Sequence, residues 1–154
     1  MIAHRLTRTF VGLVMFITVA AGCSAAATPS PSAGTMTVSD AWARASMTME
    51  RAVAVYLVIK NGTGSDDALV SVSTTAAATA ELHETVAGDS GMMQMQPVDS
   101  IPVPKGGSAT LAPGGFHIML INPTSTLDPG ASIELTLTFE HAAPVKVTAQ
   151  VKAN

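Results

Sequence analysis

The sequence predicts an all-β sandwich or barrel. From Met36 onward, short apolar or alternating segments are separated by Gly, Pro, Asn and Asp, the pattern of strands joined by tight turns. No segment carries a sustained stripe of apolar residues at the 3.6-residue spacing of a helix. With 47% apolar residues among 154, the chain can form a core without relying on disulfides or metals.

Ten segments are expected to form strands or sheet edges. In chain order they are 37–44, 52–59, 68–73, 79–86, 92–98, 101–104, 108–111, 114–120, 133–139 and 145–151. Residues 52–59 are almost continuously apolar, as in a central strand covered on both faces, whereas residues 133–139 alternate as in a half-buried strand. Two prolines make residues 101–104 either an edge or a connection, because proline cannot donate to a ladder. Residues 76–80 could alternatively form a short helical turn.

Residues 1–22 are typical of an export signal. A positively charged start precedes the apolar run 10–19, which is shorter than the roughly 20 residues that span a bilayer. The run ends in Ala-Ala-Gly-Cys, which resembles a bacterial lipobox and makes Cys23 the expected site of lipidation. Ala20 stands where a lipobox usually has leucine, so an ordinary secretory signal is the alternative.

Residues 23–35 contain two prolines and no apolar periodicity, which predicts a flexible linker between a lipid anchor and one domain at 36–154. The whole chain has a net charge of −3. Removal of residues 1–22 would take away Arg5 and Arg8 and leave six basic against eleven acidic residues, a net charge of −5. The domain has no basic cluster in sequence, which excludes nucleic acid as the expected partner. We expect an exported protein, anchored to the membrane and facing the periplasm or the outer cell surface.

The segment 114–120 contains half of a possible metal site. Side chains two residues apart in a strand share a face, so His117 and Met119 would point one way and the three apolar residues around them the other way. The hairpin that joins residues 79–86 to 92–98 would bring His83 and Met95 onto neighbouring strands. Thioether sulfur is a soft ligand that suits Cu(I), whereas zinc sites use cysteine, histidine and carboxylates. A blue-copper site also needs a thiolate, and the domain contains no cysteine.

These residues resemble the periplasmic copper chaperones called PCuAC. The motif of that family is a histidine, eleven residues, a methionine, twenty-one residues and then His-x-Met, and the chain matches it at both spacings with His83, Met95, His117 and Met119. The surrounding text is also similar, over about residues 38–139. It includes Asp-Ala-Trp-Ala-Arg at 40–44, Glu-Leu-His-Glu at 81–84, Met-Gln-Pro-Val at 95–98 and Leu-Ala-Pro-Gly-Gly-Phe-His at 111–117.

The resemblance implies a cupredoxin-like Greek-key β-sandwich that holds one Cu(I) near its surface. It also implies a copper chaperone rather than an enzyme. The expected partners are the copper ion, a copper acceptor such as a cytochrome c oxidase subunit or another copper chaperone, and the membrane through the lipid anchor. A surface lipoprotein that scavenges or stores copper for copper tolerance is the alternative. A copper oxidase is a less favoured hypothesis, because an all-soft ligand set disfavours Cu(II).

Other candidate residues are assigned from strand alternation. Met93 would share the face of Met95 and could be a secondary metal contact, whereas Met92 would be apolar cover and His141 exposed. Glu81 and Glu84, which flank His83, are expected to face away from its ring as a solvated edge.

The two largest aromatic side chains of the domain, Trp42 and Tyr56, are expected to be core residues rather than a cation–π lid.

Overall fold

A computed structural model describes residues 34–46, 51–88 and 91–153, and all ten segments predicted as strands or edges are strands. They are β1 (Met36–Arg44), β2 (Ala52–Asn61), β3 (Asp67–Ser73), β4 (Ala77–Ala87), β5 (Met93–Pro97), β6 (Ile101–Val103), β7 (Ser108–Leu111), β8 (Phe116–Pro123), β9 (Ser132–Phe139) and β10 (Val145–Lys152). The helical turn considered for residues 76–80 is wrong, because β4 begins at Ala77.

The predicted export signal, the lipidation site Cys23 and the predicted linker up to residue 33 lie outside the described residues. Within the described part of the chain, no helix is long and apolar enough to cross a membrane.

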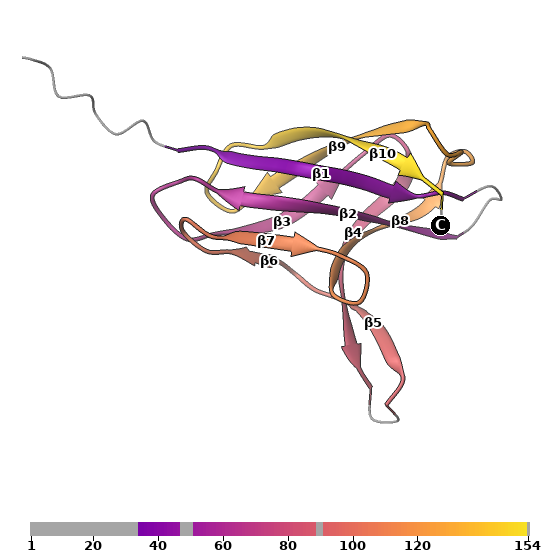
Figure 1. The fold of residues 1–154 in the computed structure, drawn as a ribbon, viewed down its shortest axis with the longest axis horizontal. Helices are drawn as coiled ribbons and strands as arrows, with labels where there is room; N and C mark the ends of the chain where they lie inside the picture. The colour runs from indigo at the N-terminus through magenta and orange to yellow at the C-terminus, as the bar shows by residue number, and fades with distance from the viewer. Residues whose placement is uncertain (1–33, 47–50, 89–90, 154) are drawn as a thin grey trace, which may run out of the picture. The chain divides into compact units, whose positions relative to one another are not determined.

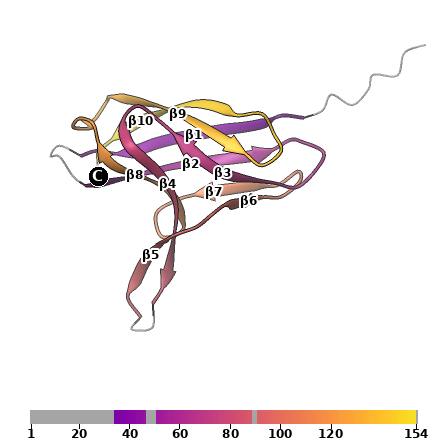
Figure 2. The ribbon, with the colours of Figure 1, turned by 180° about the vertical axis from the view of Figure 1, so that it is seen from behind.

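Hydrogen bonds join the strands into one path, β5-β4-β8-β2-β1-β10-β9-β3-β6, with β7 paired to the second half of β2. This path curls over so that β3 contacts β4 and β6 contacts β7, although neither pair is adjacent along it. Figures 1 and 2 show the resulting layers from opposite sides. The all-β sandwich is thus confirmed, and β6 lies at an edge, one of the two positions predicted from its prolines.

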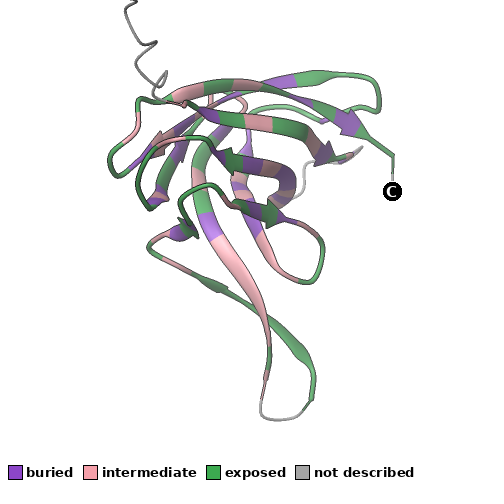
Figure 3. Ribbon diagram, turned by 60° about the vertical axis from the view of Figure 1, so that its left-hand side comes forward, coloured by how far each residue is buried: buried purple, intermediate pink, exposed green. Residues whose placement is uncertain are grey.

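The core lies between the layers and is apolar. Buried and exposed residues alternate along most strands, whereas the β4–β5 hairpin is half-buried or exposed over much of its length (Figure 3). The largest fully buried apolar side chains come from both halves of the path: Leu57, Ile59, Leu69, Ile101, Ile118, Leu120, Leu135 and Leu137. Each such side chain contributes about 1.5–3 kcal/mol by leaving water. Residues Pro31–Asn154 form one compact unit with this core, as expected of a part that folds on its own, and we call this unit the β-domain.

A β-bulge interrupts β1. Ser39 pairs with Val58 and Trp42 pairs with Tyr56, so two residues of β1 oppose one residue of β2 between these pairs. One of the two, Asp40, has a φ of 53° in the left-handed region, which aspartate tolerates better than most residues. An extra residue in one strand shifts the alternation of side chains beyond it.

The bulge moves Trp42 off the core face. Before it, Met36 is buried in the core; after it, Ala43 is fully buried and Trp42 is only half-buried on the opposite face. The expectation that Trp42 is a core residue is therefore wrong. Tyr56 is buried, as expected, but its ring packs against Trp42, with 4.6 Å between the ring centroids.

The carboxylate of Asp67, at the start of β3, holds the loop that follows β9. It accepts hydrogen bonds from the backbone N–H groups of Ala68 (2.7 Å), His141 (3.1 Å) and Ala142 (2.8 Å). Burial alone would raise the pKa of Asp67, but these three donors and the nearby His141 outweigh it and lower the pKa below the ordinary value of 3.8.

We expect Asp67→Asn to destabilise the β-domain by about 1–3 kcal/mol at pH 7. Both carboxylate oxygens of Asp67 accept hydrogen bonds, and the NH2 group that would replace one of them cannot accept any. A carboxyl group whose pKa is lowered in the folded state stabilises the fold at pH values above its unfolded pKa. This stabilisation is lost as the pH falls through the folded pKa. Urea unfolding at pH 7 and at pH 3 measures this effect. The difference in the free energy of unfolding between variant and wild type should be smaller at pH 3. Asp99→Asn, at an exposed position, is the control and should leave the free energy of unfolding unchanged. If Asp67→Asn were equally destabilising at pH 3 and at pH 7, the negative charge of Asp67 would not be the cause.

Candidate metal centre

The two predicted histidines lie directly opposite each other. His83 on β4 pairs in register with His117 on β8, and the centroids of their rings are 5.7 Å apart. Residues that face each other in an antiparallel pair project to the same side of the sheet. Both rings therefore belong to the outer face of β4 and β8, while Leu82 and Ile118, the pair beside them, are buried in the core.

The two predicted methionines lie on this same face. Met119 is two residues beyond His117 on β8 and half-buried, and Met95 on β5 pairs with Thr85, two residues beyond His83. His117, Met119, Met95 and Met93 all line one groove of about 500 Å³. Met93 and Met95 therefore lie on one side of β5, as strand alternation predicts. His83 is not among the residues that line the groove, but its ring lies beside that of His117, which does.

A hydrogen bond orients the ring of His117. Its Nδ1 lies 3.0 Å from the carbonyl oxygen of Gly115. Since a carbonyl oxygen can only accept, Nδ1 carries the proton, and in the neutral ring Nε2 is left with its lone pair. His117 is 3% exposed, and its Nε2 is buried without a hydrogen-bond partner in the described part of the chain.

The turn before β8 supplies that carbonyl. Gly114 has a φ of 83°, a conformation that glycine adopts without steric cost, and the N–H of Gly115 closes the turn by donating to Ala112 at 3.0 Å. The carbonyl of Gly115 also accepts the N–H of Thr85 on β4 at 3.1 Å. The double glycine thus fixes both the entry of β8 and the orientation of the His117 ring.

The ring of His83 is oriented by a carboxylate. Its Nε2 lies 2.9 Å from Oε2 of Glu81, and a carboxylate accepts, so the proton of the neutral ring is on Nε2. The Nδ1 atom is left with its lone pair and is buried without a partner among the described residues. The expectation that Glu81 faces away from His83 is wrong: residues two apart in a strand share a face, and only Glu84, one residue away, could point elsewhere.

In its neutral form, each imidazole therefore presents a buried nitrogen with a free lone pair. A buried polar atom without a partner costs free energy, so such atoms mark places where a ligand belongs. A second hydrogen bond that fixes the ring and its tautomer is the usual support of a metal-binding histidine. The donor set on this face, two imidazole nitrogens and neighbouring thioethers, fits a soft monovalent ion such as Cu(I).

The methionines of the hairpin are much more accessible than the histidines. Met92, Met93 and Met95 are 67%, 60% and 63% exposed, whereas the side chain of His83 is 14% exposed. The face thus combines sheltered nitrogen atoms with sulfur atoms that another molecule can reach.

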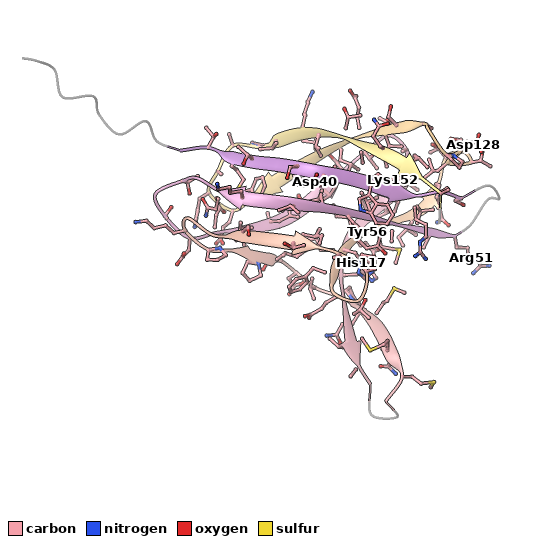
Figure 4. The ribbon with its side chains drawn as sticks, in the orientation of Figure 1. Asp40, Arg51, Tyr56, His117, Asp128 and Lys152 are labelled. Carbon is pink, nitrogen blue, oxygen red and sulfur yellow. The ribbon has the colours of Figure 1, made fainter. Side chains whose placement is uncertain are left out.

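An aromatic row extends the face beyond His117. The ring centroids of Tyr56 and His117 are 6.3 Å apart, Tyr56 packs on Trp42, and Nζ of Lys152 lies 5.6 Å from the centroid of the Trp42 ring. Figure 4 shows Lys152, Tyr56 and His117 following one another across β10, β2 and β8. Lys152 thus forms a cation–π contact with Trp42 at the end of this row.

Sequence comparison places the chain in a family. It matches the family described as "Putative lipoprotein LpqE-like" over residues 36–151. The chain belongs to the LpqE-like family. The chain is also 35% identical over 130 residues to "Putative lipoprotein Lxx21020" of Leifsonia xyli subsp. xyli, and this match covers 84% of this chain and 76% of that protein.

Solved PCuAC domains share the fold. The copper-bound PCuAC domain from PmoF2 superposes with a TM-score of 0.66 and 27% identity, covering 79% of this chain and 96% of that domain. The solution structure of CuI-DR1885 from Deinococcus radiodurans gives a TM-score of 0.57 at 27% identity, covering 86% of this chain and 84% of that one. The LpqE-like chain therefore has the cupredoxin-like β-sandwich that its sequence predicted.

Proposed function

We propose that this protein binds one Cu(I) ion outside the cytoplasm and passes it to a copper-requiring protein. The ligands in this proposal are His83, Met95, His117 and Met119. The observation that carries it is the pair of buried imidazole nitrogens, Nδ1 of His83 and Nε2 of His117, which lack partners in the described residues and share a face with the two thioethers. Two similar solved domains are copper-bound, one of them with Cu(I).

The ligand set suits transfer. All four ligands are neutral, so the ion and its ligands would together carry only the single charge of Cu(I), with the carboxylate of Glu81 behind His83. A thiolate ligand would hold a soft ion such as Cu(I) more firmly. Met95 is 63% exposed, whereas the two imidazole nitrogens are buried. An acceptor ligand can therefore replace the exposed thioether first, while the histidines still hold the ion, and the copper is never free in solution.

The acceptor in this proposal is a cuproprotein outside the cytoplasm, such as a cytochrome c oxidase subunit or another copper chaperone. The protein contributes binding and transfer rather than catalysis.

Titration of the β-domain with Cu(I) against a competing chelator tests the proposal. We expect one equivalent to bind, with quenching of Trp42, the sole tryptophan, whose ring is two contacts from His117. Zn²⁺ is the control ion and should compete poorly, because zinc sites use cysteine, histidine and carboxylate ligands. Binding of less than one equivalent, or preferential binding of zinc, would contradict the proposal.

Glu81→Gln is expected to weaken Cu(I) binding about tenfold, since loss of a charged partner behind a histidine ligand typically costs 10–100-fold in affinity. The amide keeps the size of the side chain but removes the carboxylate that orients Nε2 of His83. Glu84→Gln on the same strand is the matched control and should bind as wild type. Equal affinities of the two variants would show that Glu81 does not support the ligand.

We also infer that Cys23 carries the lipid anchor, which agrees with the lipoprotein description of the family and of the relative. The full chain expressed in a bacterium should then fractionate with membranes, and its mature N-terminal peptide should have the mass of a lipid-modified cysteine. Cys23→Ser should release the protein from the membrane fraction. If the mature chain carried no lipid and began at a residue other than Cys23, residues 1–22 would belong to an ordinary secretory signal.

A further inference from the structure

Three cations gather at the end of the sheet that carries the candidate metal centre. β1 and β10 run parallel and end there at Arg44 and Lys152, which face each other in register, and β2 begins there just after Arg51. Figure 4 shows Lys152 close to Tyr56, Arg51 farther along at the beginning of β2, and Asp128 at the same end of these strands. These three residues, which we call the cationic rim, are half of the six basic residues that follow residue 33 in a chain of net charge −3.

The charges of the cationic rim are available to a partner. Among the described residues, none of the three lies within salt-bridge distance of a carboxylate. Lys152 instead lies over the ring of Trp42, and Arg44 lines the same groove as Met119. Arg44 is also the only Lys, Arg, Asp or Glu among the described residues that line this groove.

We propose that the cationic rim and the groove form the docking surface for a copper acceptor whose own metal site is surrounded by acidic residues. This inference rests on the proposed function. With neutral ligands, a bound Cu(I) would add one positive charge to a groove that already carries Arg44, so the loaded protein would attract an acidic surface more strongly than the empty one. Opposite charges around two exchanging sites steer encounter and orient the two ligand sets.

The surface fits such a partner in a second way. Met93 and Met95 are 60% and 63% exposed and provide an apolar contact in the same groove as Arg44. Interfaces of this kind combine an apolar centre with a charged rim. After transfer the groove loses the charge of the ion, so attraction to the acceptor weakens and the empty protein can leave.

Transfer rates to two small acceptors test this surface. The β-domain is loaded with Cu(I) and mixed with the uncharged chelator neocuproine or with the dianionic bathocuproine disulfonate, which share one phenanthroline core. For Arg44→Glu/Lys152→Glu we expect the ratio of the anionic to the uncharged transfer rate to fall about tenfold. Lys60→Glu/Lys105→Glu has the same change of net charge at the opposite end of β2, and it should keep the wild-type ratio.

Added polyglutamate, an acidic polypeptide without soft ligands, should slow transfer to the anionic chelator in the wild type and in the control variant but not in the rim variant. Failure of the β-domain to take up Cu(I) would contradict the proposed function itself. Normal loading with equal rate ratios in all three proteins would overturn the docking surface alone. Binding of phosphatidylglycerol vesicles that depends on the rim, without any effect on the rate ratio, would assign the cations to a lipid surface and also overturn it.

Discussion

Met119→Leu is expected to lower the affinity for Cu(I) by roughly 100-fold, since even the loss of a group that supports a ligand costs about 10–100-fold. The same change should alter the free energy of unfolding by less than about 1.5 kcal/mol, because leucine and methionine have similar volumes. Met119 is half-buried on the groove face, so its thioether can be removed without opening the core. Competition with a Cu(I) chelator measures the first quantity, and urea unfolding measures the second.

Control substitutions at another methionine and another histidine separate the loss of a ligand from the effect of removing any methionine or histidine. Met92→Leu removes a thioether that is 67% exposed and does not line the groove, and it should bind Cu(I) as wild type. His117→Ala should lose affinity at least as much as Met119→Leu, whereas His141→Ala, an exposed histidine after β9, should not. If Met92→Leu and Met119→Leu were equally impaired, methionine content rather than the groove would govern binding.

Strand alternation was enough to predict which residues of β8 face the groove. Ile118 and Leu120 are fully buried, and His117 and Met119 face the other side, as their positions in the strand require. The hairpin of β4 and β5 was also predictable, because a short loop between two alternating segments leaves them few other ways to pair. Both properties depend only on residues close together in the chain, so the sequence alone is enough to predict them.

The pairing of His83 with His117 is of another kind. β4 and β8 are separated by three other strands in the chain, so no turn sets their register, and packing of Leu82 against the core fixes it instead. Residue spacing alone could not show that the two rings would be 5.7 Å apart. Ligand chemistry and the resemblance to PCuAC both grouped these residues, but neither gave the register of the two strands.

Trp42 and Glu81 show two different reasons for an incorrect prediction. The bulge at Asp40 inverts the alternation of β1, and a single extra residue in a strand leaves little trace in a sequence, so the position of Trp42 was not predictable. The position of Glu81 was predictable, since residues two apart in a strand share a face. Glu84, one residue from His83, lacks this relation, so the two glutamates that flank His83 are not equivalent.

Ile118→Ala should have the opposite profile to Met119→Leu. Ile118 is fully buried and pairs with Leu82 on one side and Val55 on the other, so its truncation leaves a cavity in the middle of the core. We expect the free energy of unfolding to fall by about 2–5 kcal/mol, against about 0.5–1.5 kcal/mol for the smaller change Ile118→Val. Urea unfolding of the metal-free β-domain measures both values.

The affinity of the folded Ile118→Ala protein for Cu(I) should nevertheless stay near that of the wild type, because Ile118 faces away from the groove. Excess Cu(I) should then restore part of the lost stability, since an ion that binds only the folded state shifts the equilibrium toward it. A variant that remained folded but lost Cu(I) as fully as Met119→Leu would show that the two faces of β8 are not independent. In that case, residues on both faces of β8 would contribute to metal binding as well as to core packing. Ligands could then no longer be assigned by strand face.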